Sequence, residues 1–183
     1  MQKLIAHEYM DKFSGPESLY KSLDLMAGDS DLTCNTEEFA QIMANNGNRV
    51  YRYYYNHQSS LDAWPTWSGS KHGDEIEFTF GLPLQEPKQY SAAEIKFSRD
   101  ILTYWTNFVK NGSPNPSNAW ATWPEYKAPE WKYLNLTVGL TGLTGMKNLD
   151  TQCRFFNKVV PEFVPPVQDD SGVDVESLVR YSC

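Results

Sequence analysis

The sequence predicts an α/β protein, because helical and strand patterns alternate along its 183 residues. Residues 50–56 are rich in tyrosine and predict a strand, and residues 131–137 predict another. Between them, residues 92–110 carry apolar side chains at helical spacing behind a capping box of Ser91 and Glu94. Hydrophobic residues make up 40% and aromatic residues 14% of the chain, which excludes a disordered protein, and the length predicts one core.

The chain before the first strand is predicted to be helical. Residues 1–13 form one expected helix, and a second, short helix begins at Pro16. A third begins with the cap-like pair Asn35 and Glu38 and ends at Gly47. The positions expected to be buried in the first two helices are Leu4, Ile5, Met10, Phe13, Leu19, Leu23 and Met26. Three separate helices therefore precede the sheet.

Two further helices follow the first strand. A short one is expected at residues 74–80, and the last one at residues 148–160, where Pro161 is expected to kink or end it. The stripe expected to be buried on the last helix is Leu149, Cys153, Phe156 and Val160. Residues 165–183 are polar and acidic and predict a flexible tail, which leaves residues 1–164 as part of one folded domain.

Charge and motif content exclude several classes of function. The formal net charge of −7 and the pI near 4.9 argue against nucleic acid or an acidic membrane as the main partner, and are compatible with a cationic small molecule. No run approaches the roughly 18 apolar residues of a membrane span. Three scattered histidines and three scattered cysteines offer no ligand pair at metal-site spacing, and no Gly-rich phosphate loop occurs. We therefore expect neither a metal nor another cofactor.

The cysteines Cys34, Cys153 and Cys183 allow two interpretations. Two of them could close an intrachain loop and leave the third for a bridge between chains, as in a secreted protein. In a cytosolic protein all three would be thiols. The glycosylation sequons at Asn111 and Asn135 favour export, and the proline directly after the first sequon makes Asn111 the weaker candidate.

His72 is the residue whose local setting suits catalysis. It ends a long loop, Gly73 lets backbone approach closely, and acidic residues follow from Asp74 onward. A general base needs an imidazole with one ring nitrogen oriented by an acid and the other facing a nucleophile. The local setting alone still favours a loop histidine bonded to backbone, and structural roles are favoured for His7 and His57 as well.

The histidine loop resembles that of a known family. Residues 64–81, which read WPTWSGSKHGDEIEFTFG, resemble the histidine loop of the cholinesterases and type-B carboxylesterases. Residues 50–57 resemble the strand before that loop, and residues 97–116 resemble the helix after it. Further similar segments are residues 123–126, 133–136 and 153–157, so that the resemblance covers about residues 1–164. The form is invertebrate-like, because Asp74 stands where vertebrate enzymes carry tyrosine.

The resemblance implies a fold and an activity. The fold would be the C-terminal third of an α/β-hydrolase, whose mixed central sheet is flanked by helices. The activity would be that of a serine esterase that hydrolyses acetylcholine through an acyl-serine intermediate, with His72 as the triad histidine that takes the proton from the serine and passes it to the choline oxygen. Glu75 matches a buried glutamate that orders a hydrogen-bond network. Trp64 and Trp67 match aromatic residues beside the active-site gorge. For both, a role in core packing is at least as well supported as contact with a ligand.

The resemblance also implies covalent links and partners. Cys34 and Cys153 match the last intrachain disulfide of the family, worth roughly 4–5 kcal/mol in the loop-entropy model. Cys183 matches in kind the cysteine that joins two subunits, and the first and last helices match the pair that forms a four-helix bundle across a homodimer. The expected protein is extracellular, secreted or anchored at a synaptic cell surface, acts on a small cationic choline ester, and reaches a membrane only through a C-terminal signal absent from this chain.

The family resemblance also limits what this chain can do alone. The elbow serine, the triad acid and the oxyanion-hole glycines of the family lie upstream of the matched segments, and a histidine without them cannot perform acyl transfer. We therefore predict that these 183 residues neither hydrolyse esters nor fold stably by themselves. Two alternatives share the fold: a general carboxylesterase or hormone esterase, and a cholinesterase-like adhesion protein without turnover.

Overall fold

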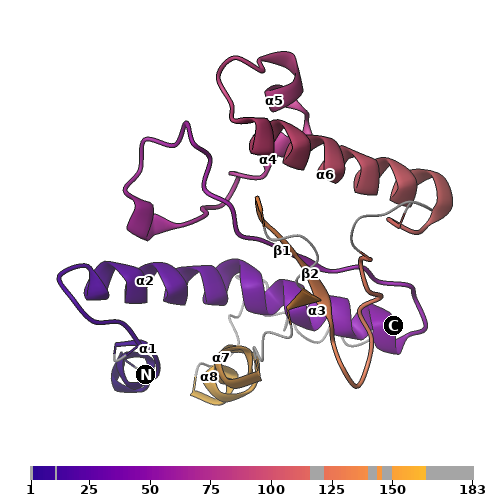
Figure 1. Cartoon of the computed structure of the whole chain (residues 1–183). Helices are drawn as coiled ribbons and strands as arrows, with labels where there is room; N and C mark the ends of the chain where they lie inside the picture. The colour runs from indigo at the N-terminus through magenta and orange to yellow at the C-terminus, as the bar shows by residue number, and fades with distance from the viewer. Residues whose placement is uncertain (1, 11, 116–121, 140–143, 146–149, 164–183) are drawn as a thin grey trace, which may run out of the picture. The chain divides into compact units, whose positions relative to one another are not determined.

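The structure is a computed structural model that describes residues 2–10, 12–115, 122–139, 144–145 and 150–163 (Figure 1). The chain divides into two compact units. One unit contains residues 1–38 and 148–183, and the other contains residues 39–147. The predicted tail at residues 165–183, with Cys183, lies outside the described residues.

The unit of residues 39–147 contains a small mixed sheet. Strand β1 (Tyr53–Tyr55) pairs in parallel with β2 (Tyr133–Leu136), so that Tyr53 lies opposite Leu134 (Figure 1). Strand β3 (Thr144–Gly145), which was not expected from the sequence, pairs with β2 in antiparallel fashion. Parallel neighbours need a long crossover connection, and a helix between β1 and β2 supplies it. Both predicted strands are thus confirmed, although each is shorter than its sequence pattern.

Helix α6 (Ala92–Asn111) forms as the sequence predicts. Ser91 caps its N-terminus and forms a capping box with Glu94, because each side chain bonds the other residue's backbone N–H. Gly112 ends the helix with φ at +65°, a left-handed value that glycine adopts without strain. The core beneath the helix is largely aromatic: Phe78, Tyr90, Phe97, Ile101, Tyr104, Trp123, Leu134 and Leu136. Burial of each large apolar side chain contributes roughly 1.5–3 kcal/mol.

Two short helices precede α6 and pack against it. The predicted helix at residues 74–80 is confirmed in shorter form as α4 (Ile76–Thr79), and α5 (Leu82–Gln85) follows directly. Gly81, with φ at +75°, separates the two. The hydroxyl of Ser98 on α6 donates to the carbonyl of Phe78 at 2.7 Å, which fixes α4 to the larger helix.

The unit that holds the N-terminus is helical, and its first helix is rotated from the expected orientation. Helix α1 (Gln2–Tyr9) buries Tyr9 instead of Leu4 and Met10, which are 41% and 42% exposed. Tyr9 packs against Phe156, and its hydroxyl donates to the buried carboxylate of Asp29 at 3.1 Å. The predicted burial of Leu4 and Met10 is therefore wrong, and so is that of Phe13, Leu19 and Leu23, which are also exposed.

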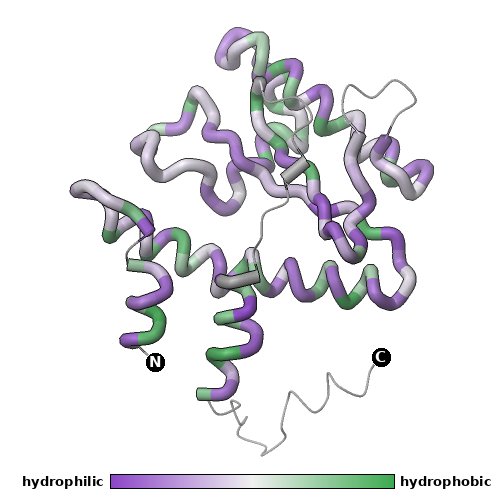
Figure 2. Tube along the Cα trace, turned by 60° about the horizontal axis from the view of Figure 1, so that its bottom comes forward, coloured by the Kyte–Doolittle hydropathy of each residue, from purple (hydrophilic) through white to green (hydrophobic). Residues whose placement is uncertain are grey.

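The expected break before the third helix does not occur. Helix α2 (Ser18–Gly28) runs through a π-helical turn, η1 (Asp29–Thr33), directly into α3 (Cys34–Asn45). The side-chain amide of Asn35 donates to the carbonyls of Ser30 and Asp31, so it supports the preceding turn instead of capping a new helix. Figure 2 shows hydrophobic residues interspersed among hydrophilic ones along this helical stretch. Gly47, with φ at +82°, follows its end as predicted.

The last helix is longer than Pro161 suggests. Helix α7 (Asp150–Arg154) continues through the π-helical turn η3 (Phe155–Val159) into α8 (Val160–Phe163). The π-helical turn ends two residues before the proline, and the helix does not end at Pro161. Phe155 is buried, and the half-buried Phe156 packs against Cys34 and Cys153, as its place in the predicted stripe implies. Leu149 of the predicted stripe lies outside the described residues.

A disulfide joins Cys34 at the start of α3 to Cys153 on α7, as the family resemblance implied. Both half-cystines are buried, and the side-chain amide of Asn157 donates to the carbonyl of Cys34 at 3.1 Å. The bridge spans 119 residues of sequence. In the part of the chain that the structure describes, no helix has the length and apolar character needed to cross a bilayer.

Candidate active site

His72 lies at the corner of a tight turn. The backbone N–H of Asp74 donates to the carbonyl of Lys71 at 3.2 Å, which makes His72 and Gly73 the two central residues of a β-turn. Gly73 has φ at +93°, and a positive φ at this position is what a type II turn requires and glycine provides. The imidazole is exposed and forms no hydrogen bond to another described residue. Both ring nitrogens are therefore open to a further group.

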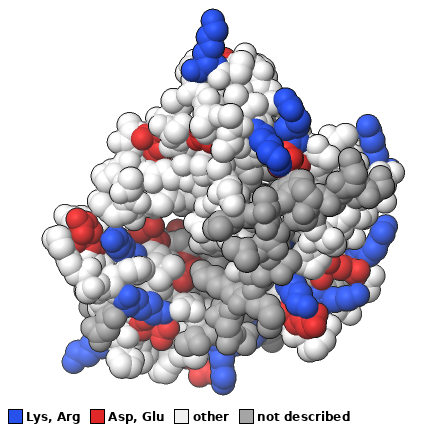
Figure 3. All heavy atoms as spheres, viewed as in Figure 1, with Lys and Arg blue, Asp and Glu red and all other residues white. Residues whose placement is uncertain are grey.

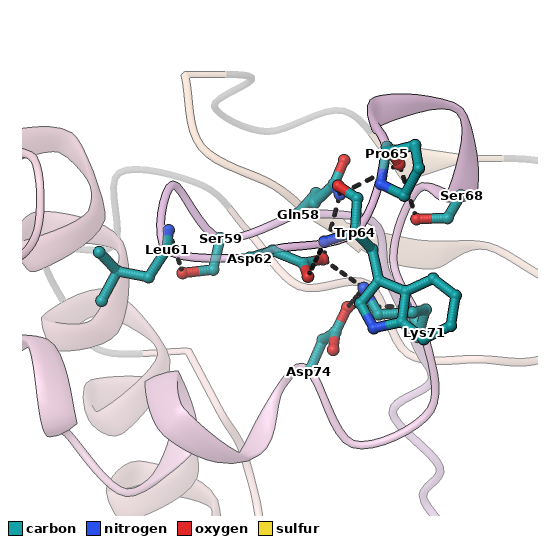
Figure 4. Close-up of polar contacts among 9 residues, drawn as sticks. All are labelled: Gln58, Ser59, Leu61, Asp62, Trp64, Pro65, Ser68, Lys71 and Asp74. Carbon is teal, nitrogen blue, oxygen red and sulfur yellow. Dashed lines mark hydrogen bonds and ion pairs between the residues drawn. The ribbon is translucent and has the colours of Figure 1, made fainter.

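Three charged side chains hold the two ends of this turn, and we call them the ionic clamp: Asp62, Lys71 and Asp74. The Oδ2 of Asp74 accepts hydrogen bonds from the backbone N–H of Lys71 at 2.8 Å and from its Nζ at 3.1 Å (Figure 4). The same Nζ donates to Oδ2 of Asp62. The bond from Lys71 lowers the pKa of the Asp62 carboxyl. Burial alone would lower the pKa of Lys71, but its bonds to the two carboxylates raise it.

The loop that leads to the turn is fixed by side-chain bonds to its own backbone. The amide nitrogen of Gln58 donates to Oδ2 of Asp62 at 3.0 Å and to the carbonyl of Trp64 at 3.1 Å (Figure 4). Oδ1 of Asp62 accepts the backbone N–H of Trp64 at 2.9 Å. A single 3₁₀ turn, η2 (Thr66–Ser68), follows, and the hydroxyl of Ser68 donates to the carbonyl of Pro65. The loop thus keeps a defined course with almost no regular structure.

Glu94 anchors the start of this loop to α6. Its carboxylate is 2% exposed and accepts hydrogen bonds from the backbone N–H and the hydroxyl of Ser60, and from the same two groups of Ser91, at 2.7–2.9 Å. Nε2 of His57 lies 3.3 Å from Oε1. Burial on its own would raise the pKa of Glu94, but the bonds from Ser60 and Ser91 lower it to about 2. The carboxylate is therefore charged at every physiological pH.

The group of Ser60, His57 and Glu94 contains the residue types of a catalytic triad but not its order. In a triad the imidazole stands between the alcohol and the acid. Here the carboxylate stands in the middle, because the Ser60 hydroxyl donates to Glu94 and His57 contacts the other carboxylate oxygen. No described contact joins the serine to the imidazole. The arrangement fits a structural anchor and not an activated nucleophile.

Glu75, which the resemblance implied to be a buried network glutamate, is half-buried at the start of α4. Its carbonyl accepts the N–H of Thr79 at 2.9 Å, and its side chain bonds no other described residue. Burial raises the pKa of Tyr55, and the charges of Glu77, Asp74 and Glu75 raise it further. The buried glutamate that orders a network among the described residues is Glu94.

The two tryptophans of the histidine loop differ in exposure. Trp64 is 61% exposed, and Trp67 in η2 is half-buried. Neither belongs to the buried aromatic core of the described residues.

An open groove of about 610 Å³ lies beside the turn, with Gly73 and Asp74 in its wall. Its lining combines exposed apolar side chains with carboxylates: Leu61, Ile76, Phe80, Asp62 and Glu77.

The two glycosylation candidates occupy different settings. Asn111 is exposed at the last position of α6. Asn135 lies in β2, the middle strand of the sheet, and its Oδ1 is buried without a hydrogen-bond partner among the described residues. Asn111, the weaker candidate in the sequence, is thus the one whose side chain is exposed.

On the face shown in Figure 3, acidic and basic side chains of the described residues are interspersed. Among those residues, no three potential ligands gather to hold a metal ion.

Comparison with known proteins places the chain in a family. The family model described as "Carboxylesterase family" matches residues 1–156. The chain belongs to the carboxylesterase family, and the expectation from the histidine loop is confirmed. The helices and the parallel strand pair agree with the α/β class that this family implies, of which the chain holds a part.

Three of the curated relatives that the chain resembles are acetylcholinesterases. The chain is 38% identical to acetylcholinesterase of Gallus gallus over 79% of its own length and 19% of the relative's. It is 32% identical to acetylcholinesterase 1 of Caenorhabditis elegans over 90% of its own length and 28% of the relative's. It is 36% identical to acetylcholinesterase of Bungarus fasciatus over 79% and 24%. The chain thus spans between 19% and 28% of the length of these relatives.

Proposed function

We propose that this chain forms part of a serine esterase of the α/β-hydrolase fold and supplies its general base, His72. The observation that carries the proposal is the exposed imidazole at the corner of a turn whose two ends are fixed and whose ring nitrogens bond nothing else described. A triad histidine needs this combination, because it must reach an alcohol on one side and an acid on the other. The family match and the printed names of the relatives support the same activity.

The proposed reaction is the hydrolysis of acetylcholine to choline and acetate, which would end cholinergic transmission. Nε2 of His72 takes the proton from the serine as its oxygen attacks the ester carbonyl, and then gives that proton to the departing choline oxygen. The same imidazole then takes a proton from a water molecule whose oxygen attacks the acyl carbon, the bond from that carbon to the serine oxygen breaks, and the imidazolium returns the proton to the serine as acetate leaves. The chain contains no Gly-x-Ser-x-Gly motif and spans a fraction of its relatives, so we assign the serine and the triad acid to sequence outside it.

Location and assembly follow from the same proposal. The buried disulfide between Cys34 and Cys153 supports an extracellular, secreted or surface-anchored protein, because such bonds persist in oxidising compartments. The proposed homodimer uses α1 and the last helix, with a bridge at Cys183. Exposed apolar side chains on these helices support that interface: Leu4 and Phe163 are 41% and 60% exposed.

The test is a variant of the full-length gene product that carries this chain. His72→Ala is expected to lower turnover of acetylcholine about 10⁴-fold or more per folded molecule, because removal of one triad member disables the whole unit. His7→Ala, at an exposed position of α1, is the matched control and should leave turnover unchanged. Secretion reports folding of each variant, and labelling of the wild-type protein by a fluorophosphonate reports the serine, because the label needs the same general base as the ester.

Each alternative has its own outcome in this experiment. Unchanged turnover in His72→Ala removes the proposed base. Faster turnover of aryl esters than of choline esters indicates a general carboxylesterase or hormone esterase. A wild-type protein that binds no fluorophosphonate and hydrolyses no ester is a non-catalytic member of the family.

A further inference from the structure

We propose that Lys71 is a positioning residue for His72, and that it acts by holding the carboxylates of Asp62 and Asp74 together across the turn. The inference rests on the proposed function, since it concerns how the general base is held. Lys71 directly precedes His72, and every bond that closes the turn involves Lys71 or Asp74.

The first step concerns what fixes the imidazole. His72 bonds no other described side chain or backbone group, so the position of its ring depends on the backbone of the turn. That backbone is closed twice, by the N–H of Asp74 on the carbonyl of Lys71 and by the N–H of Lys71 on the carboxylate of Asp74. A change at either end therefore moves the ring.

The second step concerns why a cation is needed. Nζ of Lys71 bonds Oδ2 of Asp74 and Oδ2 of Asp62, so the ammonium group lies between two carboxylates. Without it, two negative charges remain at close range and repel each other. Asp62 cannot easily move away, because it also accepts bonds from Gln58 and from the backbone of Trp64. The repulsion would then act on Asp74 and open the turn.

The third step connects the clamp to the rest of the unit. Asp62 belongs to the loop whose start Glu94 attaches to α6 through Ser60. Lys71 thus joins the end of the loop, where His72 lies, to the part that the helix fixes. Loss of this link leaves the turn attached only through its own backbone and α4.

The test uses the full-length gene product and normalises turnover to the serines that a fluorophosphonate labels. Lys71→Met is expected to lower kcat per labelled site about 10- to 100-fold with KM changed less than about twofold, because small displacements of a catalytic group have effects of this size. Lys71→Arg, which keeps the charge, should retain most activity. Lys88→Met removes one exposed lysine of the same unit and is the control that should behave as wild type.

A suppressor sharpens the test. Asp62→Asn removes one of the two repelling charges, so the double variant Lys71→Met with Asp62→Asn should recover part of the kcat that Lys71→Met loses. A residue that matters only for folding would lower the number of labelled sites or the melting temperature while kcat per site stayed the same. Equal kcat per site in Lys71→Met and wild type overturns the proposal.

Three further results remain decisive. If Lys71→Met yields no folded protein, kcat per labelled site is measured for the single variant Asp62→Asn instead. A loss smaller than the one expected for Lys71→Met supports the clamp, and no loss overturns it. If wild type is labelled and active while the clamp variants are normal, only the clamp is wrong. If wild type is not labelled, the proposed function fails, and the clamp's catalytic role fails with it.

Discussion

The two compact units are stabilised in different ways. The unit of residues 39–147 has an aromatic core and a buried carboxylate that joins its loop to its long helix. The helical unit of residues 1–38 and 148–183 buries few large side chains among those described, and its first two helices leave leucines such as Leu19 and Leu23 exposed. It contains instead a disulfide and a bond from Tyr9 to the buried Asp29. A unit with a sparse core depends on a covalent link, and a unit with a full core can accommodate a polar network.

The largest expected effect is the loss of the disulfide. Replacement of both Cys34 and Cys153 by serine should destabilise the helical unit by up to roughly 4–5 kcal/mol, a limit that is reached when the loop between them, which includes residues 39–147, is unfolded as well. Chemical unfolding of the full-length protein, followed at helical wavelengths, measures this. The unit of residues 39–147, called the aromatic unit after its core, should unfold at the same denaturant concentration as in the wild-type protein. A shift shared equally by both units would show that their stabilities are coupled.

A smaller effect is expected from acid, and in the aromatic unit. The pKa of Glu94 is lowered to about 2 in the folded protein, from an ordinary value of 4.5. Its contribution to stability is therefore present above pH 4.5 and is lost as the pH falls through 2, by roughly 3 kcal/mol in total. Glu94→Gln should show a flatter dependence of unfolding free energy on pH across this window. Glu86→Gln, at an exposed position, should show the wild-type slope.

The smallest effects are expected from two glycines, and they have opposite signs. Gly28 ends α2 with φ at −60° and has open space where a Cβ would lie, so Gly28→Ala should stabilise the helical unit by about 0.4–1 kcal/mol. Gly112 has φ at +65°, so Gly112→Ala should destabilise the aromatic unit by about 1 kcal/mol. Melting temperatures of both variants check the signs. Destabilisation by Gly28→Ala would contradict the helical backbone assigned to it.

The sequence predicted α6 well because the information that defines this helix is local. The capping box of Ser91 and Glu94, the apolar spacing and the terminal Gly112 all lie within the helix or beside it. The first helices were harder to predict, because the face that α1 buries depends on Asp29 and Phe156, which are distant in sequence. The continuous run through η1 also replaced an expected cap at Asn35 by bonds to the preceding turn.

The candidate site shows the same division. His72 and Gly73 could be found from the sequence, because a histidine followed by a glycine within a family-like segment is a local pattern. The ionic clamp could not, since Asp62 and Lys71 are separated by nine positions and only the folded loop brings them together. Glu94 was visible as part of a capping box, but its bonds to Ser60 span 34 positions and have no sequence signal.

Because one carboxylate accepts the amide protons of both Ser60 and Ser91, the loop and the first turn of α6 cannot fluctuate independently. A local opening that frees one serine leaves Glu94 short of partners and so favours release of the other. These two amides, from segments without a common secondary structure, should therefore exchange with solvent deuterium in a single cooperative event. The start of the loop that carries His72 should therefore open at the same rate as the N-terminus of α6.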